Sequence, residues 1–413
     1  MRRNERLVTT YSIVGVDRER GLMGGAVQSH AFAVGSIVVW ARAGVGVVAT
    51  QSVVNPNFGP RGLAALAEGH PAPNALDALL ADDDAPAVRQ VSLITPDGVS
   101  ATHTGERCIA EAGHIRGDGY SVQANMMDRT GVPEAMAEAW NGSTGPLPER
   151  LLSALKAAEG AGGDIRGRQS ASLTVVSTTP RADIVEAMPL DVRVDDHPDP
   201  LGELERLMRL HAAYRHIDEG DEASARGESE AAREHYTTAR RLAPDRVELA
   251  FWEALANAGA GDIEGARRQL ESIDRAGDDR WRRLSLRLPP TGLIALDAEG
   301  WDELVGPRPR RIYHVITDEP WDAAGVEYRP GAFESEGFVH CSFAHQISSV
   351  IRRHFPSTPD PLLLEIDRAA VDDLLRLEVG DTLGEAYPHL YGAIPKSAVV
   401  RHGTAAEILP AFR

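Results

Sequence analysis

The stretch RLVTTYSIVGVD, residues 6–17, places two adjacent hydroxyl side chains, Thr9 and Thr10, at the start of an apolar, alternating run. Such a run is typical of a β-strand. Threonine favours extended backbone, so strand formation alone explains the pair. A threonine that becomes the first residue of a mature chain can also act as a nucleophile, and on these residues alone both explanations stay open.

The runs that follow, up to about residue 194, are short, rich in Gly, Ala, Val and Ser, and mostly bounded by turn residues. Pro96, Asp97 and Gly98 between two of them predict a hairpin turn. Strands interrupted by helices in this order predict two packed sheets flanked by helices, a four-layer αββα sandwich over residues 1–196. The predicted strands lie within 9–16, 21–29, 35–54, 89–105, 119–127 and 170–178, and the predicted helices within 60–69, 72–83, 132–142 and 148–160.

The composition changes after this part, and residues 197–290 are rich in Ala, Arg, Glu and Leu at helical spacing. Small residues recur there at a helix-turn-helix period, which resembles the pattern of tetratricopeptide repeats. That resemblance implies an all-α helical-repeat domain, which offers one face to a protein partner or to self-association. A linker with proline pairs is predicted over 291–308. Strand-like runs and one helix predict a separate small α+β domain over 309–413. The small residues are Gly227, Ala232, Ala239, Gly259 and Ala266.

Length and composition narrow the class of protein. A chain of 413 residues is expected to form two or three domains. Its formal charge of −18 disfavours nucleic acid and anionic membrane as general partners. Cys108 and Cys341 lie far apart and are expected to be free thiols in a reducing compartment. No apolar run has the length of a signal peptide or a membrane span, so we expect a cytoplasmic protein.

Several motifs in the first domain carry a family resemblance when taken together: TYSIVGVD, VGSIVVWARAGVGVVATQS, NPNFGPRGL, SVQANMM, GGDIRGRQSASL and DHPDPL. With them the domain resembles the domain of unknown function 1028 family over nearly its whole length. The resemblance implies a fold like that of the N-terminal-nucleophile hydrolases. The family itself brings no activity that can be transferred to this chain.

In hydrolases of that class the α-amine of the first residue is the base that activates its own hydroxyl. The resemblance implies Thr10 as this nucleophile, with Thr9 as the second candidate, and Asn125 as an oxyanion donor or substrate contact. An amidohydrolase acting on a small amide, with no cofactor and no metal, is the function implied. Nine residues precede Thr10, however, and a blocked amine is no base. Three explanations stay open: a true start at Val8, removal of the segment by the protein itself, or a wrong choice of nucleophile.

Polar residues at strand ends in the same domain are candidates for binding a substrate. They follow glycine-rich runs or enter strands, positions from which side chains reach a cleft. Ion pairing and packing explain them equally well. The candidates are Ser29, His30, Arg42, Arg168 and Gln169, with Asp164 and Arg166 beside the last two.

The C-terminal motifs IYHVI, GFVHCS, LLLEID and YPHLYGAIP resemble the domain of unknown function 952 family. The resemblance implies a fold like ADP-ribosyltransferases and a pocket for NAD or a nucleotide. His314 would contact the ribose hydroxyls there. The other pocket candidates are His340, Glu385, His389 and Tyr391.

Three alternatives remain for this domain and for the chain. A zinc site of His314, His340 and His389 is weighed but not favoured, because no short His-x-His or Cys-x-x-Cys spacing supports it. The same side chains also suit a hydrogen-bonded core. For the chain as a whole, the alternatives to an amide hydrolase are a non-catalytic binding protein built on enzyme-like folds, and an NAD-dependent transferase confined to the C-terminal domain.

Overall fold

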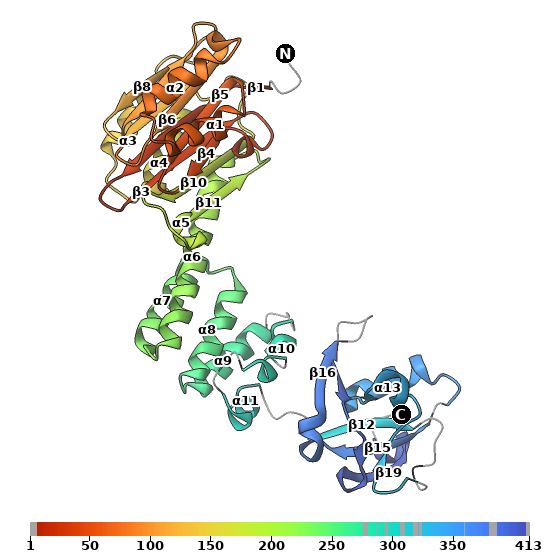
Figure 1. The fold of residues 1–413 in the computed structure, drawn as a ribbon. Coiled ribbons are helices and arrows are strands. Elements are labelled where there is room, and N and C mark those ends of the chain that lie inside the picture. The colour runs from red at the N-terminus through yellow and green to blue at the C-terminus, as the bar shows by residue number, and fades with distance from the viewer. Residues whose placement is uncertain are drawn as a thin grey trace. The chain divides into compact units, whose positions relative to one another are not determined.

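The structure is a computed structural model of the 413-residue chain. It describes residues 6–275, 280–285, 287–292, 294, 296–305, 310–316, 321, 324–358, 360–379 and 386–409. The chain divides into two compact units, residues 1–214 and residues 215–413 (Figure 1). Sheets and helices occur together, which confirms the prediction of a mixed α+β multidomain protein. Cys108 and Cys341 are both free thiols, as expected.

Two antiparallel sheets form the centre of the first unit. In the first sheet β5 pairs with β1, β4 and β6, and β6 pairs with β7. The second sheet has the order β11-β10-β3-β2-β9-β8. The first sheet consists of β1 (Arg6–Val8), β4 (Val39–Arg42), β5 (Gly46–Val54), β6 (Arg89–Ile94) and β7 (Ser100–Thr104). The second consists of β2 (Tyr11–Asp17), β3 (Leu22–Ser29), β8 (Gly113–Gly117), β9 (Tyr120–Ala124), β10 (Ser170–Ser177) and β11 (Leu190–Val194).

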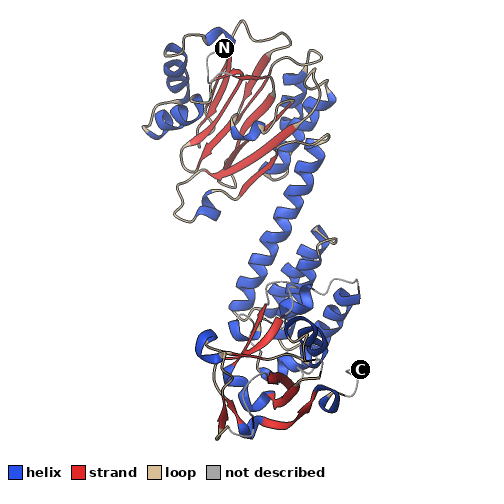
Figure 2. Cartoon of the chain, turned by 90° about the vertical axis from the view of Figure 1, so that its right-hand side faces the viewer, coloured by secondary structure: helices blue, strands red, loops and turns tan. Residues whose placement is uncertain are grey.

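Helices cover the outer face of each sheet. Helices α1 (Phe58–Ala67) and α2 (Ala72–Ala81) share an apolar cluster with the first sheet. Helices α3 (Val132–Gly142) and α4 (Leu147–Gly160) share one with the second sheet. A third cluster, built largely from valines, fills the space between the sheets. Helices therefore flank two face-to-face sheets (Figure 2).

Small residues let these layers approach closely. A Cβ atom added to Gly15 of β2 would lie 2.4 Å from the Trp140 ring of α3. Gly15 therefore lets the indole lie directly on the sheet, where Tyr120 packs against it with ring centroids 5.6 Å apart.

Helices dominate the beginning of the second unit. The long helix α6 (Pro200–Ala225) crosses the boundary between the units. Buried apolar residues of α8, α9 and α11 form one cluster, which includes Phe251, Leu255 and Trp301. Among the helices that the structure describes, none is long and apolar enough to cross a membrane. The other helices of this part are α7 (Ser229–Leu242), α8 (Val247–Gly259), α9 (Ile263–Arg275), α10 (Arg280–Ser285) and α11 (Ala298–Val305).

The C-terminal part contains short antiparallel sheets around a separate core. The strands pair as β12-β15-β19, β14-β17-β16 and β13-β18. Ile347 and Ile351 of α13 (Ala344–His354) pack against Tyr313 and Val315 of β12. The strands are β12 (Arg311–Ile316), β13 (Glu327–Tyr328), β14 (Val339–His340), β15 (Leu362–Asp367), β16 (Leu375–Val379), β17 (Ala386–Leu390), β18 (Ile394–Pro395) and β19 (Val399–Thr404). The short helices of the chain are α5 (Ile184–Ala187), α12 (Phe333–Glu336) and α14 (Ala405–Ile408).

Candidate functional site

The Thr9–Thr10 dipeptide links the two sheets of the first unit. Strand β1 ends at Val8, which pairs with Ser52 in the first sheet. Strand β2 begins at Tyr11, which pairs with its neighbours in the second sheet. Both threonines are fully buried. The peptide bond between them therefore lies at the crossing from one sheet to the other, and we call this place the sheet crossing.

The carbonyl of Thr9 accepts two hydrogen bonds. One comes from the hydroxyl of Ser29, and the other from Nη2 of Arg166 at 3.1 Å. Oδ2 and Oδ1 of Asp164 lie 2.7 and 3.0 Å from Nη2 and Nε of the same guanidinium. The Asp164 carboxylate also accepts from the backbone N–H of His30 at 3.2 Å. An ion pair with a fully buried carboxylate thus fixes one of the two donors on this carbonyl.

The carbonyl of Thr10 has three donors close by, the most distant being Nδ2 of Asn125 at 3.4 Å. Nε2 of Gln51 lies 3.0 Å from it and the backbone nitrogen of Asn125 lies 3.1 Å from it. The Thr10 hydroxyl donates to the carbonyl of Val8 at 3.0 Å. In the chain with residues 1–9 attached, the Thr10 nitrogen is a peptide nitrogen and cannot accept a proton as a base.

Buried amides surround this threonine. Nε2 of Gln51 and Nδ2 of Asn125 both donate to Oε1 of Gln90, at 2.7 and 2.9 Å. Ser12 donates to Oε1 of Gln51 at 2.7 Å. Oδ1 of Asn125 has no hydrogen-bond partner among the described residues. This side chain therefore has a free acceptor beside Thr10. Leaving a buried oxygen unpaired is costly, so a ligand that donates to it would gain that energy.

The residues expected to bind a substrate divide into two groups. Ser29, His30 and Asn125 lie at the sheet crossing, as described above. Arg42 pairs with Gly46 at the first residue of β5, whereas β1 pairs with the last residues of that strand. Because a strand rises about 3.3 Å per residue, the structure places Arg42 far from the crossing.

Arg168 and Gln169 instead face surface carboxylates. Arg168 lies 3.3 Å from Asp199 and 3.5 Å from Glu159, and Gln169 donates to Asp196 at 3.1 Å. These side-chain contacts are directed away from the Thr9 and Thr10 carbonyls, while the backbone N–H of Gln169 donates to the carbonyl of Ser29 at 3.2 Å.

Sequence reasoning missed Gln51 and Gln90. Each is a large amide in a strand that is mostly buried, and both are fully buried themselves. The sequence did offer a signal for them. A large polar side chain in a buried strand needs a hydrogen-bond partner, so it indicates a polar site inside the fold.

A second cluster of polar side chains lies on the C-terminal domain, where His340 of β14 and His389 of β17 are paired across the strands. Nδ1 of His340 lies 3.2 Å from Nε2 of His389. Nε2 of His340 lies 2.7 Å from Glu336, and Nδ1 of His389 lies 2.6 Å from Glu378. The hydroxyl of Tyr391 donates to Glu378 at 2.9 Å. These five side chains form the histidine cluster.

Burial lowers the pKa of His389, while its hydrogen bond to Glu378 opposes that shift. The same bond holds the pKa of Glu378 below its usual range. Phe338 stacks on His389 with ring centroids 4.4 Å apart. Glu336, Phe338 and Glu378 were not among the predicted site residues. Glu336 and Phe338 lie within four residues of His340 in the sequence, whereas Glu378 reaches His389 through the pairing of β16 with β17, which the sequence does not display.

His314 does not contact the imidazole rings of the histidine cluster. Its Nδ1 contacts the backbone carbonyl of His340 at 2.7 Å, and burial lowers its pKa to about 4. Its Nε2 has no hydrogen-bond partner within the described part of the chain. A neutral ring that donates from Nδ1 leaves Nε2 as a free acceptor. Glu385, the remaining predicted pocket residue, lies outside the described residues.

Comparison with known proteins identifies the class of each region. The model of the family described as "Family of unknown function (DUF1028)" matches residues 10–204. The model described as "Protein of unknown function (DUF952)" matches residues 315–402. The chain belongs to the DUF1028 family and carries a DUF952 domain in its C-terminal part. The expected resemblances to the DUF1028 and DUF952 families are therefore confirmed.

Two solved structures are similar to parts of the chain. Protein SPO2555 from Silicibacter pomeroyi, described as DUF1028, is 30% identical, with a TM-score of 0.45 over 49% of this chain and 85% of that chain. Protein CC0527 from Caulobacter crescentus is 25% identical, with a TM-score of 0.21 over 23% of this chain and 84% of that chain. A double mutant of the same protein gives the same values. No curated protein matches the chain.

Proposed function

We propose that the N-terminal unit is an amide hydrolase of the N-terminal-nucleophile type, with Thr10 as the nucleophile and a small amide as the substrate. One observation carries the proposal: a hydroxyl and a guanidinium donate to the carbonyl that directly precedes Thr10. Two donors on a carbonyl oxygen stabilise the negative charge that develops there when the carbonyl carbon is attacked. The family match begins at residue 10, which agrees with this choice.

The same two donors support cleavage of the Thr9–Thr10 bond by the protein itself. In that step the Thr10 oxygen attacks the Thr9 carbonyl carbon, and the hydroxyl proton passes to the Thr10 nitrogen as the C–N bond breaks. The product is an ester between Thr9 and the Thr10 oxygen. Water hydrolyses this ester, releasing residues 1–9 and leaving Thr10 with a free α-amine.

Catalysis on an external amide then repeats the chemistry. The freed amine takes the proton of the Thr10 hydroxyl, and the oxygen adds to the substrate carbonyl carbon. Ser29 and Arg166, which have lost the Thr9 carbonyl, donate to the new oxyanion. The amine returns the proton to the leaving nitrogen, an acyl-enzyme forms, and water hydrolyses it. The free Oδ1 of Asn125 accepts a hydrogen bond from the substrate.

Chains with defined first residues test the proposal. Three proteins are compared: the full chain, a chain that begins at Thr9, and a chain that begins at Thr10. Each is made as a fusion protein and released by a protease that cuts directly before its first residue. A panel of aminoacyl and N-acyl p-nitroanilides reports hydrolysis. We expect activity from the chain that begins at Thr10 and its loss in Thr10→Ala. Activity that survives Thr10→Ala would refute the assignment, and activity only from the chain that begins at Thr9 would transfer it to Thr9.

A second candidate function is binding of NAD or a nucleotide by the C-terminal domain, and the free Nε2 of His314 favours it. A buried neutral imidazole with an unused acceptor suits a ribose hydroxyl as donor. The test is a thermal-shift titration of the full chain with NAD and with adenosine nucleotides. We expect a shift that His314→Ala and His340→Ala both remove. Saturating ligand without a shift would refute this candidate. Binding by a chain that hydrolyses no amide would favour the non-catalytic alternative.

A further inference from the structure

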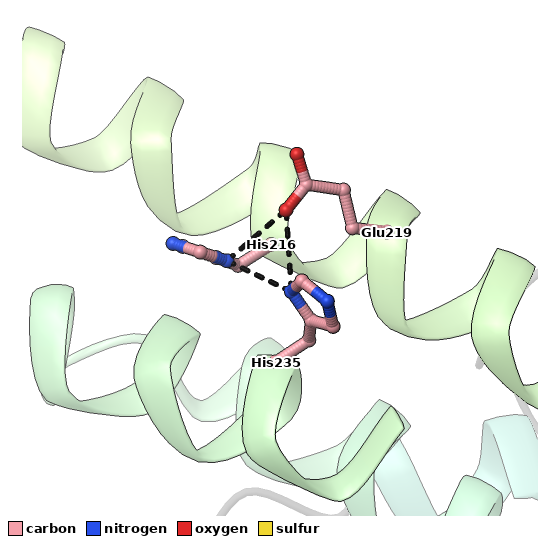
Figure 3. Close-up of side chains that lie close together, drawn as sticks. All are labelled: His216, Glu219 and His235. Atoms are coloured by element: carbon pink, nitrogen blue, oxygen red, sulfur yellow. Dashed lines mark hydrogen bonds and ion pairs between the residues drawn. The ribbon is translucent and has the colours of Figure 1, made fainter. Parts of the chain in front are cut away.

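Helices α6 and α7 bring together three metal-ligating side chains outside both sites described above (Figure 3). His216 and Glu219 lie one turn apart on α6, and His235 faces them from α7. The two Nδ1 atoms lie 3.1 Å apart. Oε2 of Glu219 lies 3.3 Å from Nδ1 of His216 and 3.2 Å from Nδ1 of His235. We call these three residues the triad.

Protons alone do not satisfy this triangle of atoms. Three contacts join the two nitrogens and the carboxylate oxygen, and each ring proton satisfies one of them. If both Nδ1 atoms carry protons and donate to the carboxylate, two N–H groups face each other. If only one Nδ1 carries a proton, that proton forms one hydrogen bond. The lone pair of the other Nδ1 then faces the carboxylate oxygen or the other ring without a hydrogen bond between them. A cation between the three atoms replaces every unfavourable contact with a coordinate bond.

The spacing of the triad is that of a metal's ligand shell. For bonds of about 2.0–2.1 Å and tetrahedral angles, the ligand atoms of Zn²⁺ lie about 3.3–3.4 Å from one another. The three separations, from 3.1 to 3.3 Å, are close to this value. Two histidines and a glutamate also form a known three-ligand set for zinc, with the fourth position left to water. Each side chain of the triad is between 33 and 39% exposed, so solvent reaches that position.

Contacts on both helices hold the triad in place. Arg215 binds the other carboxylate oxygen of Glu219 at 3.3 Å, which leaves Oε2 directed at the histidines. Gly220, the next residue, packs against Tyr236, the residue after His235. A Cβ at Gly220 would lie 2.7 Å from the Tyr236 ring, so glycine sets the close approach of the two helices. Partners that orient metal ligands in this way tune metal affinity.

The local charge also favours a cation. Asp218, Asp221 and Glu222 lie within three residues of Glu219 on the same helix. A group of negative charges of this kind lowers the energy of a cation placed near it.

We propose that His216, Glu219 and His235 bind a divalent transition-metal ion, Zn²⁺ by preference, at the junction of α6 and α7. The donor set of two imidazoles and one carboxylate favours Zn²⁺ over Mg²⁺ and Ca²⁺, which take oxygen ligands. The site joins the two helices and leaves one coordination position open to water.

The test is isothermal titration of the metal-free, untagged full chain with zinc chloride. We expect one ion per chain, and neither Mg²⁺ nor Ca²⁺ in excess should displace it. His216→Ala, His235→Ala and Glu219→Gln should each lower the affinity at least about tenfold, since even residues that only orient metal ligands have effects of 10–100-fold. His70→Ala is the matched control, because that exposed histidine lies in the other unit, and it should leave binding unchanged.

Two readouts keep the proposal falsifiable if a variant folds poorly. Circular dichroism of each variant confirms its helix content, and Glu219→Gln keeps the size of the side chain. X-ray absorption of the zinc-loaded wild-type protein should show nitrogen and oxygen at about 2.0–2.1 Å and no sulfur at about 2.3 Å. No zinc binding by the wild-type chain, equal binding by the three variants, or a sulfur ligand would each overturn the proposal. Thr10→Ala should bind zinc normally, which separates this site from the proposed hydrolase.

Discussion

At the scale of single residues, the Asp164–Arg166 pair is the most constrained feature of the sheet crossing. The Asp164 side chain is fully buried and the Arg166 side chain is 27% exposed. Together they hold the Thr9 carbonyl, the N–H of His30 and the Thr9 hydroxyl. Removing one partner of a buried pair leaves an uncompensated charge, so this pair is expected to matter for stability as well as for chemistry.

Arg166→Ala and Arg168→Ala provide a matched comparison two residues apart. We expect Arg166→Ala to lower the free energy of unfolding by about 3–5 kcal/mol, because Asp164 loses its buried partner. Arg168 is 42% exposed and neither of its partners, Glu159 and Asp199, is fully buried, so Arg168→Ala should cost less, about 1 kcal/mol or below. Urea unfolding followed by circular dichroism measures both. Equal losses in the two variants would contradict the role given to Asp164.

His314 predicts a pH dependence of stability. Its pKa is about 4 in the folded protein, against about 6.5 for an ordinary histidine. The unfolded chain therefore binds more protons between these values, and stability falls as the pH drops through this window. From pH 7 to pH 5 the loss attributable to His314 is about 2 kcal/mol. Urea unfolding at the two pH values measures the loss, and His314→Gln should make the dependence shallower by that amount. An unchanged slope would show that His314 is not a buried neutral group.

At the scale of elements, glycine positions decide how closely helices lie on the sheets. We expect Gly15→Ala to lower the free energy of unfolding by about 1–3 kcal/mol, because the added methyl group meets the Trp140 ring. Gly142→Ala is the control, since a Cβ there has no neighbour within 4 Å among the described residues. That variant should be neutral or slightly stabilising in α3. Urea unfolding compares the two, and a neutral Gly15→Ala would contradict the packing of α3 on β2.

Local patterns predicted much of the first unit. The helix expected over 132–142 is α3 (Val132–Gly142), because an apolar face at helical spacing follows a glycine and a proline. The turn expected at Pro96, Asp97 and Gly98 lies between β6 and β7, with Gly98 at a φ of 85°. Turn residues and periodicity act within a few positions, so they can be recognised without knowledge of the fold.

Features that depend on contacts between residues far apart in the sequence were harder to predict from it. Gln51 of β5 contacts Thr10 at the start of β2, in the other sheet, and Gln90 of β6 contacts Gln51. His216 and His235 are 19 positions apart and meet through the packing of Gly220 on Tyr236. Arg42 was expected near the nucleophile, but the pairing of β4 on β5 places it at the opposite end of the strand. No short spacing marks such contacts.

At the scale of the whole molecule, the chain joins a DUF1028 region and a DUF952 region with a helical segment between them. Each region has its own apolar cluster and its own group of polar side chains. The three proposals are therefore separable: variants at Thr10, at His314 and at His235 should each abolish one property and leave the other two.

Intact-mass spectrometry of the full chain tests the central claim most directly. The purified protein is incubated at neutral pH and sampled over hours, with Thr10→Ala as the control. The account predicts that wild-type protein loses residues 1–9 and gains a first residue of Thr10, whereas Thr10→Ala keeps its full mass. A wild-type chain that retains residues 1–9, above all one that still hydrolyses an amide, would contradict it.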